Sequence, residues 1–102
     1  MSKILVAKVS DIKPGELKGV SAGDKDILLA NVEGNFFAIG DICTHMGCKL
    51  SGGVIADTKI VECPCHASQF DLTTGAVIKG PAKSPEMKFE VIVEGDNIYV
   101  QA

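Results

Sequence analysis

The stretch from Cys43 to Asp71 contains all four cysteines and both histidines of this 102-residue chain. They form two groups, Cys43-Thr44-His45 and Cys63-Pro64-Cys65-His66, with Cys48 between them. Each group offers a thiolate and an imidazole a residue or two apart, and these side chains are common protein ligands of transition metals. The pattern therefore indicates two loop tips that converge on one metal centre.

Length and composition predict a single domain covering residues 1–102, because a second hydrophobic core would be too small to stand alone. Hydrophobic residues make up 46% of the chain, which also contains eleven glycines and four prolines. This composition indicates a globular domain with many turns rather than a disordered chain.

The formal net charge of −3, with lysine and acidic residues interspersed, argues against a nucleic-acid partner, which would require a basic stripe. The apolar run near the N-terminus is only about five residues, too short for a signal peptide or a membrane span. We therefore expect a cytoplasmic protein with no membrane anchor. In that compartment a disulfide would be unusual.

Short runs of alternating or β-branched residues, separated by turn residues, predict an all-β domain. Residues 19–26 are predicted to be a loose polar connection, and two prolines and a glycine make residues 80–85 irregular. No window keeps a helical period over ten residues. Strands are predicted at 4–9, 26–31, 35–39, 54–56, 59–62, 69–72, 76–78, 88–93 and 98–101.

Two thiolates and two imidazoles suit either tetrahedral zinc or an iron–sulfur centre in which histidines replace cysteines on one iron. Zinc sites usually take one ligand type from each loop, as C-x(2–4)-C and H-x(3–5)-H. Here each loop contributes one ligand of each type, as C-x-H and C-x-x-H. This spacing favours a binuclear cluster with both sulfur ligands on one iron and both nitrogen ligands on the other.

These two groups resemble the motif of the Rieske [2Fe–2S] family, and the resemblance extends over about residues 3–101. It implies an all-β, Rieske-type domain of short antiparallel sheets, in which two hairpin loops at about 41–71 form the cluster-binding subdomain. The flanking residues that share the family's order are 34–39, 50–53, 69–71, Gly75 and Gly80-Pro81.

The resemblance implies one [2Fe–2S] cluster per chain, with Cys43 and Cys63 on the buried iron and His45 and His66 on the outer iron. The alternatives are a structural zinc site, or a buried thiol pair with two surface histidines. Replacing two thiolates by neutral imidazoles makes the oxidised cluster less negative, so it accepts an electron more easily.

Cys48 and Cys65 lie one in each loop, at places where Rieske proteins of quinol-oxidising complexes carry a disulfide. The resemblance thus implies a Cys48–Cys65 bridge that would clamp the two loops together. The alternative, favoured by a cytoplasmic location, is a pair of thiols that merely pack.

Four further residues have places that the resemblance links to the environment of the cluster. Ser68 stands where high-potential members carry a serine that donates to a bridging sulfide, and Phe70 stands where those members carry a tyrosine. Met46 would shield the cluster, and Pro81 would begin a third loop over it. One hydrogen-bond donor to the cluster is kept at Ser68 and one is lost at Phe70. This implies a reduction potential between those of the low- and high-potential Rieske classes.

The function that follows is a soluble one-electron carrier that exchanges electrons with a reductase, an oxygenase or another oxidoreductase. Outside the ligand stretch no acid–base pair, nucleophile or second metal site is evident, so we expect an electron-transfer protein and not an enzyme. The alternatives are a non-catalytic relay subunit fixed within an oxygenase or oxidoreductase complex, a structural zinc module, and a thiol–disulfide switch at Cys48 and Cys65.

Overall fold

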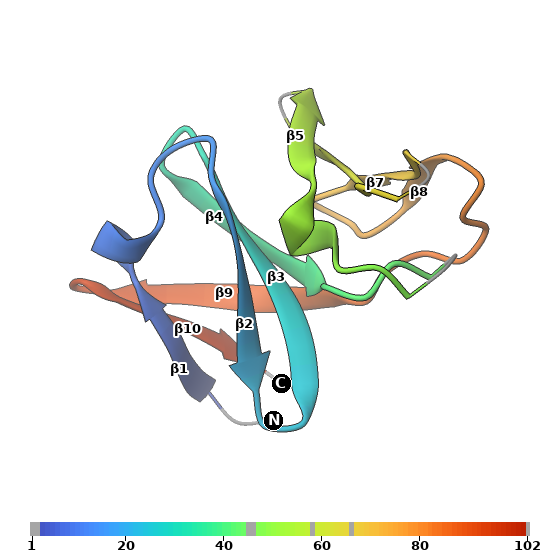
Figure 1. Ribbon diagram of the computed structural model, residues 1–102. Coiled ribbons are helices and arrows are strands. Elements are labelled where there is room, and N and C mark those ends of the chain that lie inside the picture. The colour runs from blue at the N-terminus through green and yellow to red at the C-terminus, as the bar shows by residue number, and fades with distance from the viewer. Residues whose placement is uncertain (1–2, 45–46, 58, 66, 102) are drawn as a thin grey trace.

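The computed structural model describes residues 3–44, 47–57, 59–65 and 67–101, and ten short strands dominate it (Figure 1). This confirms the predicted all-β class. The elements are β1 (Lys3–Lys8), η1 (Val9–Asp11), β2 (Leu17–Ala22), β3 (Lys25–Val32), β4 (Asn35–Gly40), η2 (Leu50–Gly52), β5 (Val54–Asp57), β6 (Ile60–Glu62), β7 (Gln69–Asp71), β8 (Val77–Lys79), β9 (Lys88–Glu94) and β10 (Asn97–Gln101).

The strands form two antiparallel sheets that lie at opposite ends of the molecule (Figure 1). The larger sheet has the order β1-β10-β9-β4-β3-β2, and the smaller has the order β5-β6-β7-β8. The edge strands β1 and β2 of the larger sheet are in contact, so this sheet curls towards a closed barrel. The smaller sheet contains only residues from the ligand stretch and its immediate continuation.

Strand β3 separates two hydrophobic cores. Leu28 and Ala30 belong to the first core, which the small sheet shares, while Ile27 and Leu29 belong to the second core inside the large sheet. Successive side chains of a strand point to opposite faces, so a run that is apolar at every position fills both cores. Full burial of each such side chain stabilises the fold by roughly 1.5–3 kcal/mol. The small sheet is thereby packed firmly onto the large one.

The prediction of a loose connection at 19–26 is wrong, because this region contains most of β2. Strand β2 pairs with β3 from Leu17 opposite Ala30 to Ala22 opposite Lys25. It is an edge strand with few buried side chains, so its hydrogen bonds to β3 form it without a strong apolar pattern. Gly19 begins the stretch that was predicted to be a loose connection. An added Cβ at this position would lie 2.8 Å from the Ser51 Oγ. The glycine allows η2 to approach the strand.

The hairpins predicted from the sequence are present, whereas the pairs β1–β10, β4–β9 and β6–β7 were not predicted. The hairpins β3–β4, β5–β6 and β9–β10 occur where turn residues separate apolar runs. Residues 80–85 contain no strand, as two prolines and a glycine predicted, and the strand-free stretch continues to Met87; the Gly80–Pro81 peptide is cis. Among the described residues, no helix is long and apolar enough to cross a membrane.

Candidate metal centre

Two loops at one end of the molecule carry the predicted ligands. The first loop (residues 41–49) leaves β4 and leads into η2, and the second loop (residues 63–68) joins β6 to β7. A third stretch, the covering segment (residues 80–87), runs from β8 to β9 and passes beside both loops (Figure 1). His45, Met46 and His66 lie outside the described residues.

The two loops close on their cysteines with the same pair of backbone hydrogen bonds. The N–H of Cys43 donates to the carbonyl of Cys48 at 2.7 Å, and the carbonyl of Cys43 accepts from Gly47 at 2.9 Å. The second loop has the same two hydrogen bonds, which Cys63 makes with the residues five and four positions after it. There the N–H of Cys63 donates to Ser68 at 2.8 Å, and its carbonyl accepts from Ala67 at 3.2 Å.

The fourth residue after each cysteine has a left-handed backbone conformation. Gly47 has φ +76°, and Ala67 has φ +62°. This conformation allows the chain to turn back so that both hydrogen bonds can form. Glycine adopts it freely, whereas alanine pays roughly 1–2 kcal/mol because its Cβ crowds the following carbonyl oxygen. The two loops thus share one shape although their sequences differ.

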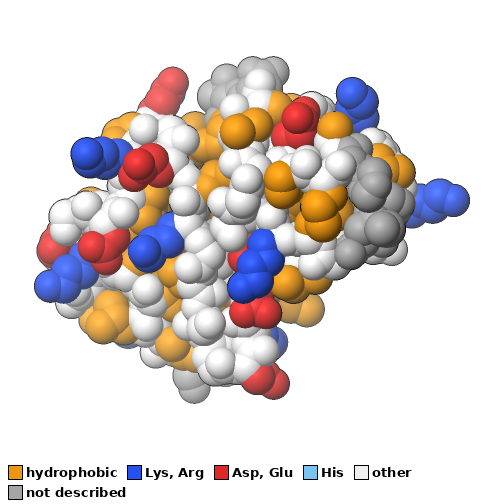
Figure 2. All heavy atoms as spheres, viewed as in Figure 1, with side chains coloured by type: hydrophobic (Ala, Val, Ile, Leu, Met, Phe, Trp, Pro, Cys, Tyr) orange, Lys and Arg blue, Asp and Glu red, His pale blue; other side chains and the backbone are white. Residues whose placement is uncertain are grey.

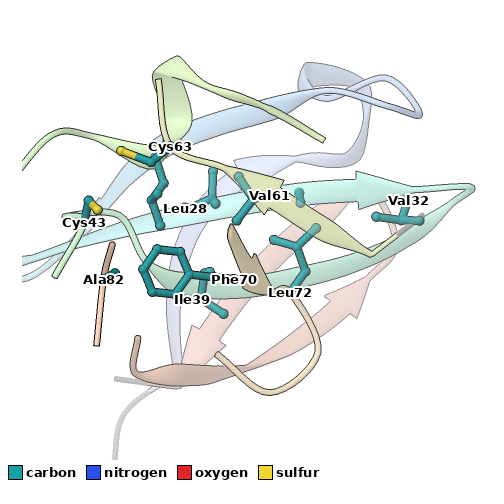
Figure 3. Close-up of a cluster of buried hydrophobic side chains, with 11 residues drawn as sticks. Leu28, Val32, Ile39, Cys43, Val61, Cys63, Phe70, Leu72 and Ala82 are labelled. Carbon is teal, nitrogen blue, oxygen red and sulfur yellow. The ribbon is translucent and has the colours of Figure 1, made fainter. Parts of the chain in front are cut away.

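The thiols of Cys43 and Cys63 are buried at one end of the first core. Their side chains are 2% and 3% exposed, and neither takes part in the disulfide. Figure 3 shows both at the same end of the core, with Ala82 nearby and Val32 at the far end. A buried thiolate is costly in an apolar environment unless a cation offsets its charge. Two such thiols therefore fit the sulfur side of an iron–sulfur cluster.

A disulfide joins the two loops. Cys48 at the end of the first loop and Cys65 in the second are bonded, with their Cα atoms 6.5 Å apart. The half-buried Cys48 packs against the first core, while Cys65 is exposed. This is the pair that the family resemblance implies, and the bond ties the first loop to the second.

Asp41 holds the base of the first loop, a role that the sequence did not suggest. Its carboxylate is buried and accepts hydrogen bonds from the backbone N–H of Ser51 at 2.7 Å and from the Ser51 hydroxyl at 2.9 Å. The carbonyl of Asp41 also accepts from the N–H of Leu50. Both ends of the loop are therefore tied together below Cys43. The only signal in the sequence was an acidic residue directly after a strand.

The covering segment is hydrogen-bonded to both loops. The buried Ser68 hydroxyl accepts from the backbone N–H of Ala82 at 3.0 Å, and the Thr44 hydroxyl donates to the carbonyl of Ser84 at 2.7 Å. A hydroxyl that accepts one hydrogen bond still has its own hydrogen to donate. Pro81 is exposed and lies at the start of this segment. The segment consequently shields the site from one side.

Phe70 and Glu86 complete the surroundings of the loops. The fully buried Phe70 ring extends from β7 towards the end of the core where Cys43 and Cys63 lie (Figure 3). The carboxyl group of Glu86 is also buried, and its Oε2 has no hydrogen-bond partner among the residues that the structure describes. Burial, together with the nearby Asp41 carboxylate, raises the pKa of Glu86 to about 7, although a hydrogen bond from the Thr44 backbone opposes the rise.

Sequence and structural comparisons identify the class of protein that has this arrangement. The Rieske [2Fe-2S] domain family matches residues 2–95, which include both ligand groups. The 3-phenylpropionate/cinnamic acid dioxygenase ferredoxin subunit of Escherichia coli K12 is 38% identical over 100 residues, covering 98% of this chain and 93% of the relative. The chain belongs to the Rieske [2Fe-2S] domain family.

Solved structures agree with this assignment. The ferredoxin of carbazole 1,9a-dioxygenase from Nocardioides aromaticivorans superposes with a TM-score of 0.92 at 28% identity, covering 98% of this chain and 97% of that one. A chain from a complex of reduced oxygenase and oxidised ferredoxin in carbazole 1,9a-dioxygenase gives 0.88 at 33% identity, covering 96% and 91%. The relatives are dioxygenase ferredoxins, whereas the cysteine pair alone suggested the quinol-oxidising complexes.

The left-handed Ala67 leads to a stability prediction. We expect Ala67→Gly to raise the free energy of unfolding by about 0.5–1 kcal/mol, since relief of the backbone strain exceeds the extra freedom of glycine in the unfolded chain. The matched control is Ala56→Gly on the exposed strand β5, which should lower it by a similar amount. Denaturant titration of both variants measures this. An equal loss of unfolding free energy in Ala67→Gly and Ala56→Gly would show that the backbone at Ala67 is not strained.

The buried carboxyl of Glu86 leads to a prediction about pH. Its pKa is higher in the folded state than in the unfolded chain, so the stability it contributes is complete below about pH 4.5 and is lost as pH rises through about 7. From pH 5 to pH 8 this loss is on the order of 2 kcal/mol. Glu86→Gln should remove that component and make the protein more stable at pH 8. If the stability of Glu86→Gln fell by the same amount between pH 5 and pH 8, the decline could not come from the Glu86 carboxyl.

Proposed function

We propose that Cys43, His45, Cys63 and His66 hold one [2Fe–2S] cluster in a domain that occupies the whole chain. The observation that supports this best is the repeated hydrogen-bond pattern of the two loops. It holds two buried thiols at one end of the core. Membership of the Rieske family adds support for the complete set of four ligands.

The cluster, when bound, supplies a centre that accepts and releases one electron. The protein residues hold its ligands in place and exclude water from its sulfur side. Cys43 and Cys63 are fixed by the loop hydrogen bonds and the first core, and the disulfide prevents the loops from separating. A ligand shell that moves little on reduction keeps electron transfer fast. From membership of the family we expect the histidine end of the cluster at the surface, where an electron could leave.

We infer that the protein is a ferredoxin that carries single electrons to an oxygenase and catalyses no reaction on a substrate itself. Two observations support this role: the relatives are ferredoxin subunits of dioxygenases, and a similar ferredoxin chain is found in a complex with an oxygenase. We further propose that it operates in the cytoplasm and takes its electrons from a reductase.

Metal analysis of anaerobically purified protein tests the proposal. We expect two irons and two acid-labile sulfides per chain, a brown colour and an electron paramagnetic resonance signal only after reduction. Cys43→Ser should abolish the cluster, whereas Lys8→Gln on β1, far from the loops, should retain it. Colourless protein with stoichiometric zinc would overturn the assignment. Co-elution with a stable partner would favour the alternative of a fixed relay subunit.

The residues beside the loops predict how the reduction potential responds to substitution. Ser68→Ala should lower it by about 65–130 mV, the equivalent of a hydrogen bond to a charged group worth roughly 1.5–3 kcal/mol. Phe70→Tyr should raise it, because its new hydroxyl lies at the ring end that points towards the cysteines. Redox titration followed by electron paramagnetic resonance measures both.

Two variants serve as matched controls for these potentials. Ser10→Ala removes an exposed hydroxyl in η1, and Phe36→Tyr adds one beside the second core, so neither should change the potential. An unchanged potential in Ser68→Ala would remove the serine from the set of groups that tune the cluster.

A further inference from the structure

The exposed charges around the site are all positive. Over residues 41–44, 47–53, 63–65, 67–69 and 79–85, the exposed charged side chains are Lys49, Lys79 and Lys83. Asp41 is the single acidic residue in these ranges, and it is buried. The whole chain has a formal net charge of −3. The exposed charged side chains of these ranges are therefore cationic, although the molecule as a whole is acidic.

Acidic side chains close to this end offset part of the lysine charge, but they reach less far into solvent, because Asp41 and Glu86 are buried and Glu62 is half-buried. The carboxylate of Asp41 accepts two hydrogen bonds from Ser51, and that of Glu62 accepts one from the Gln69 side chain at 2.9 Å. Glu86 is buried, and its pKa of about 7 leaves it only partly ionised near neutral pH. Figure 2 shows lysine side chains projecting from the end where Figure 1 places the loops.

One of these lysines lies at a hollow beside the first loop. Thr44, Pro81, Lys83 and Ser84 line an open depression of about 430 Å³. Thr44 stands between the predicted ligands Cys43 and His45 in the sequence, so this depression lies beside the first ligand loop. It is large enough to accept a side chain from another protein, and Lys83 is the charged residue among the described residues that line it.

We propose that the redox partner docks on this lysine-bearing end with a face that carries carboxylates, and that one carboxylate side chain enters the hollow beside Lys83. This inference rests on the proposed electron-transfer function and adds the chemistry of the partner. Electrostatic complementarity of this kind accelerates encounter and sets the orientation of docking.

Distance explains how an acidic protein can attract an acidic partner. The molecule is 38 Å long, whereas charges are screened over about 8 Å at physiological ionic strength. Carboxylates on the large sheet are therefore largely hidden from a partner that approaches the site end. Lys83 and the other lysines of the site end lie close enough to act on that partner.

Small oxidants of opposite charge test the sign of this end without the natural partner. The reduced holoprotein is mixed with ferricyanide, which takes one electron from the cluster and becomes ferrocyanide, and the rate is followed by the colour of the cluster. We expect this rate to fall as ionic strength rises from about 0.15 to 1 M, a range in which screening lengths of about 8 to 3 Å make the oxidant respond to nearby charges and not to the net charge of the molecule. With the cation tris(phenanthroline)cobalt(III), the rate should rise instead.

Substitutions of Lys83 test whether this side chain supplies the positive charge that attracts ferricyanide. Lys83→Gln should reduce the ferricyanide rate about threefold at an ionic strength of about 0.15 M, and Lys83→Glu should reduce it further. Lys8→Gln, an equal change of charge on β1 at the other end, should leave it nearly unchanged. The reduction potentials of all variants are measured first, so that any change in driving force is separated from docking.

The outcomes separate a failure of the docking proposal from a failure of the proposed electron-transfer function. A ferricyanide rate that rises with ionic strength, or equal effects of Lys83→Gln and Lys8→Gln, would overturn the cationic docking face. The electron-transfer function would survive either result, because it depends on a cluster that cycles between two states. Protein that forms no cluster would fail at the earlier metal analysis.

Discussion

The site depends on a pair of backbone hydrogen bonds that closes each loop on its cysteine. In both loops the cysteine N–H donates to a carbonyl five residues ahead, and the cysteine carbonyl accepts from an N–H four residues ahead. These bonds direct the thiols of Cys43 and Cys63 towards one end of the core. The disulfide and the covering segment then act on loops whose shape is already set.

Burial and charge divide the surroundings of the site into two parts. On the inner side, the apolar first core holds the thiols, and the buried carboxyl of Glu86 in the covering segment has a raised pKa. On the outer side, the exposed charged groups of the described loop residues are lysines. An electron carrier benefits from both parts, because a dry interior keeps the ligands still while a charged surface orients the partner.

Local pattern and turn chemistry predicted most strands, because apolar alternation and turn residues act over a few neighbouring positions. Strand β2 was missed because an edge strand forms through its partner and not through its own side chains. Asp41 and Glu86 were missed for a related reason. Their importance comes from Ser51, Thr44 and burial, which the fold brings to them from other segments.

By itself the sequence determined the fold class, the family and the candidate ligand set, since these depend on the kind and spacing of nearby residues. Only the tertiary structure decided which groups surround those ligands. It paired Cys48 with Cys65, placed Ser68 against Ala82, and gathered lysines from three separate segments at one end. The physical reason is that burial, screening and hydrogen bonding depend on distance in space, and the strand pairings that set those distances link residues far apart in the chain.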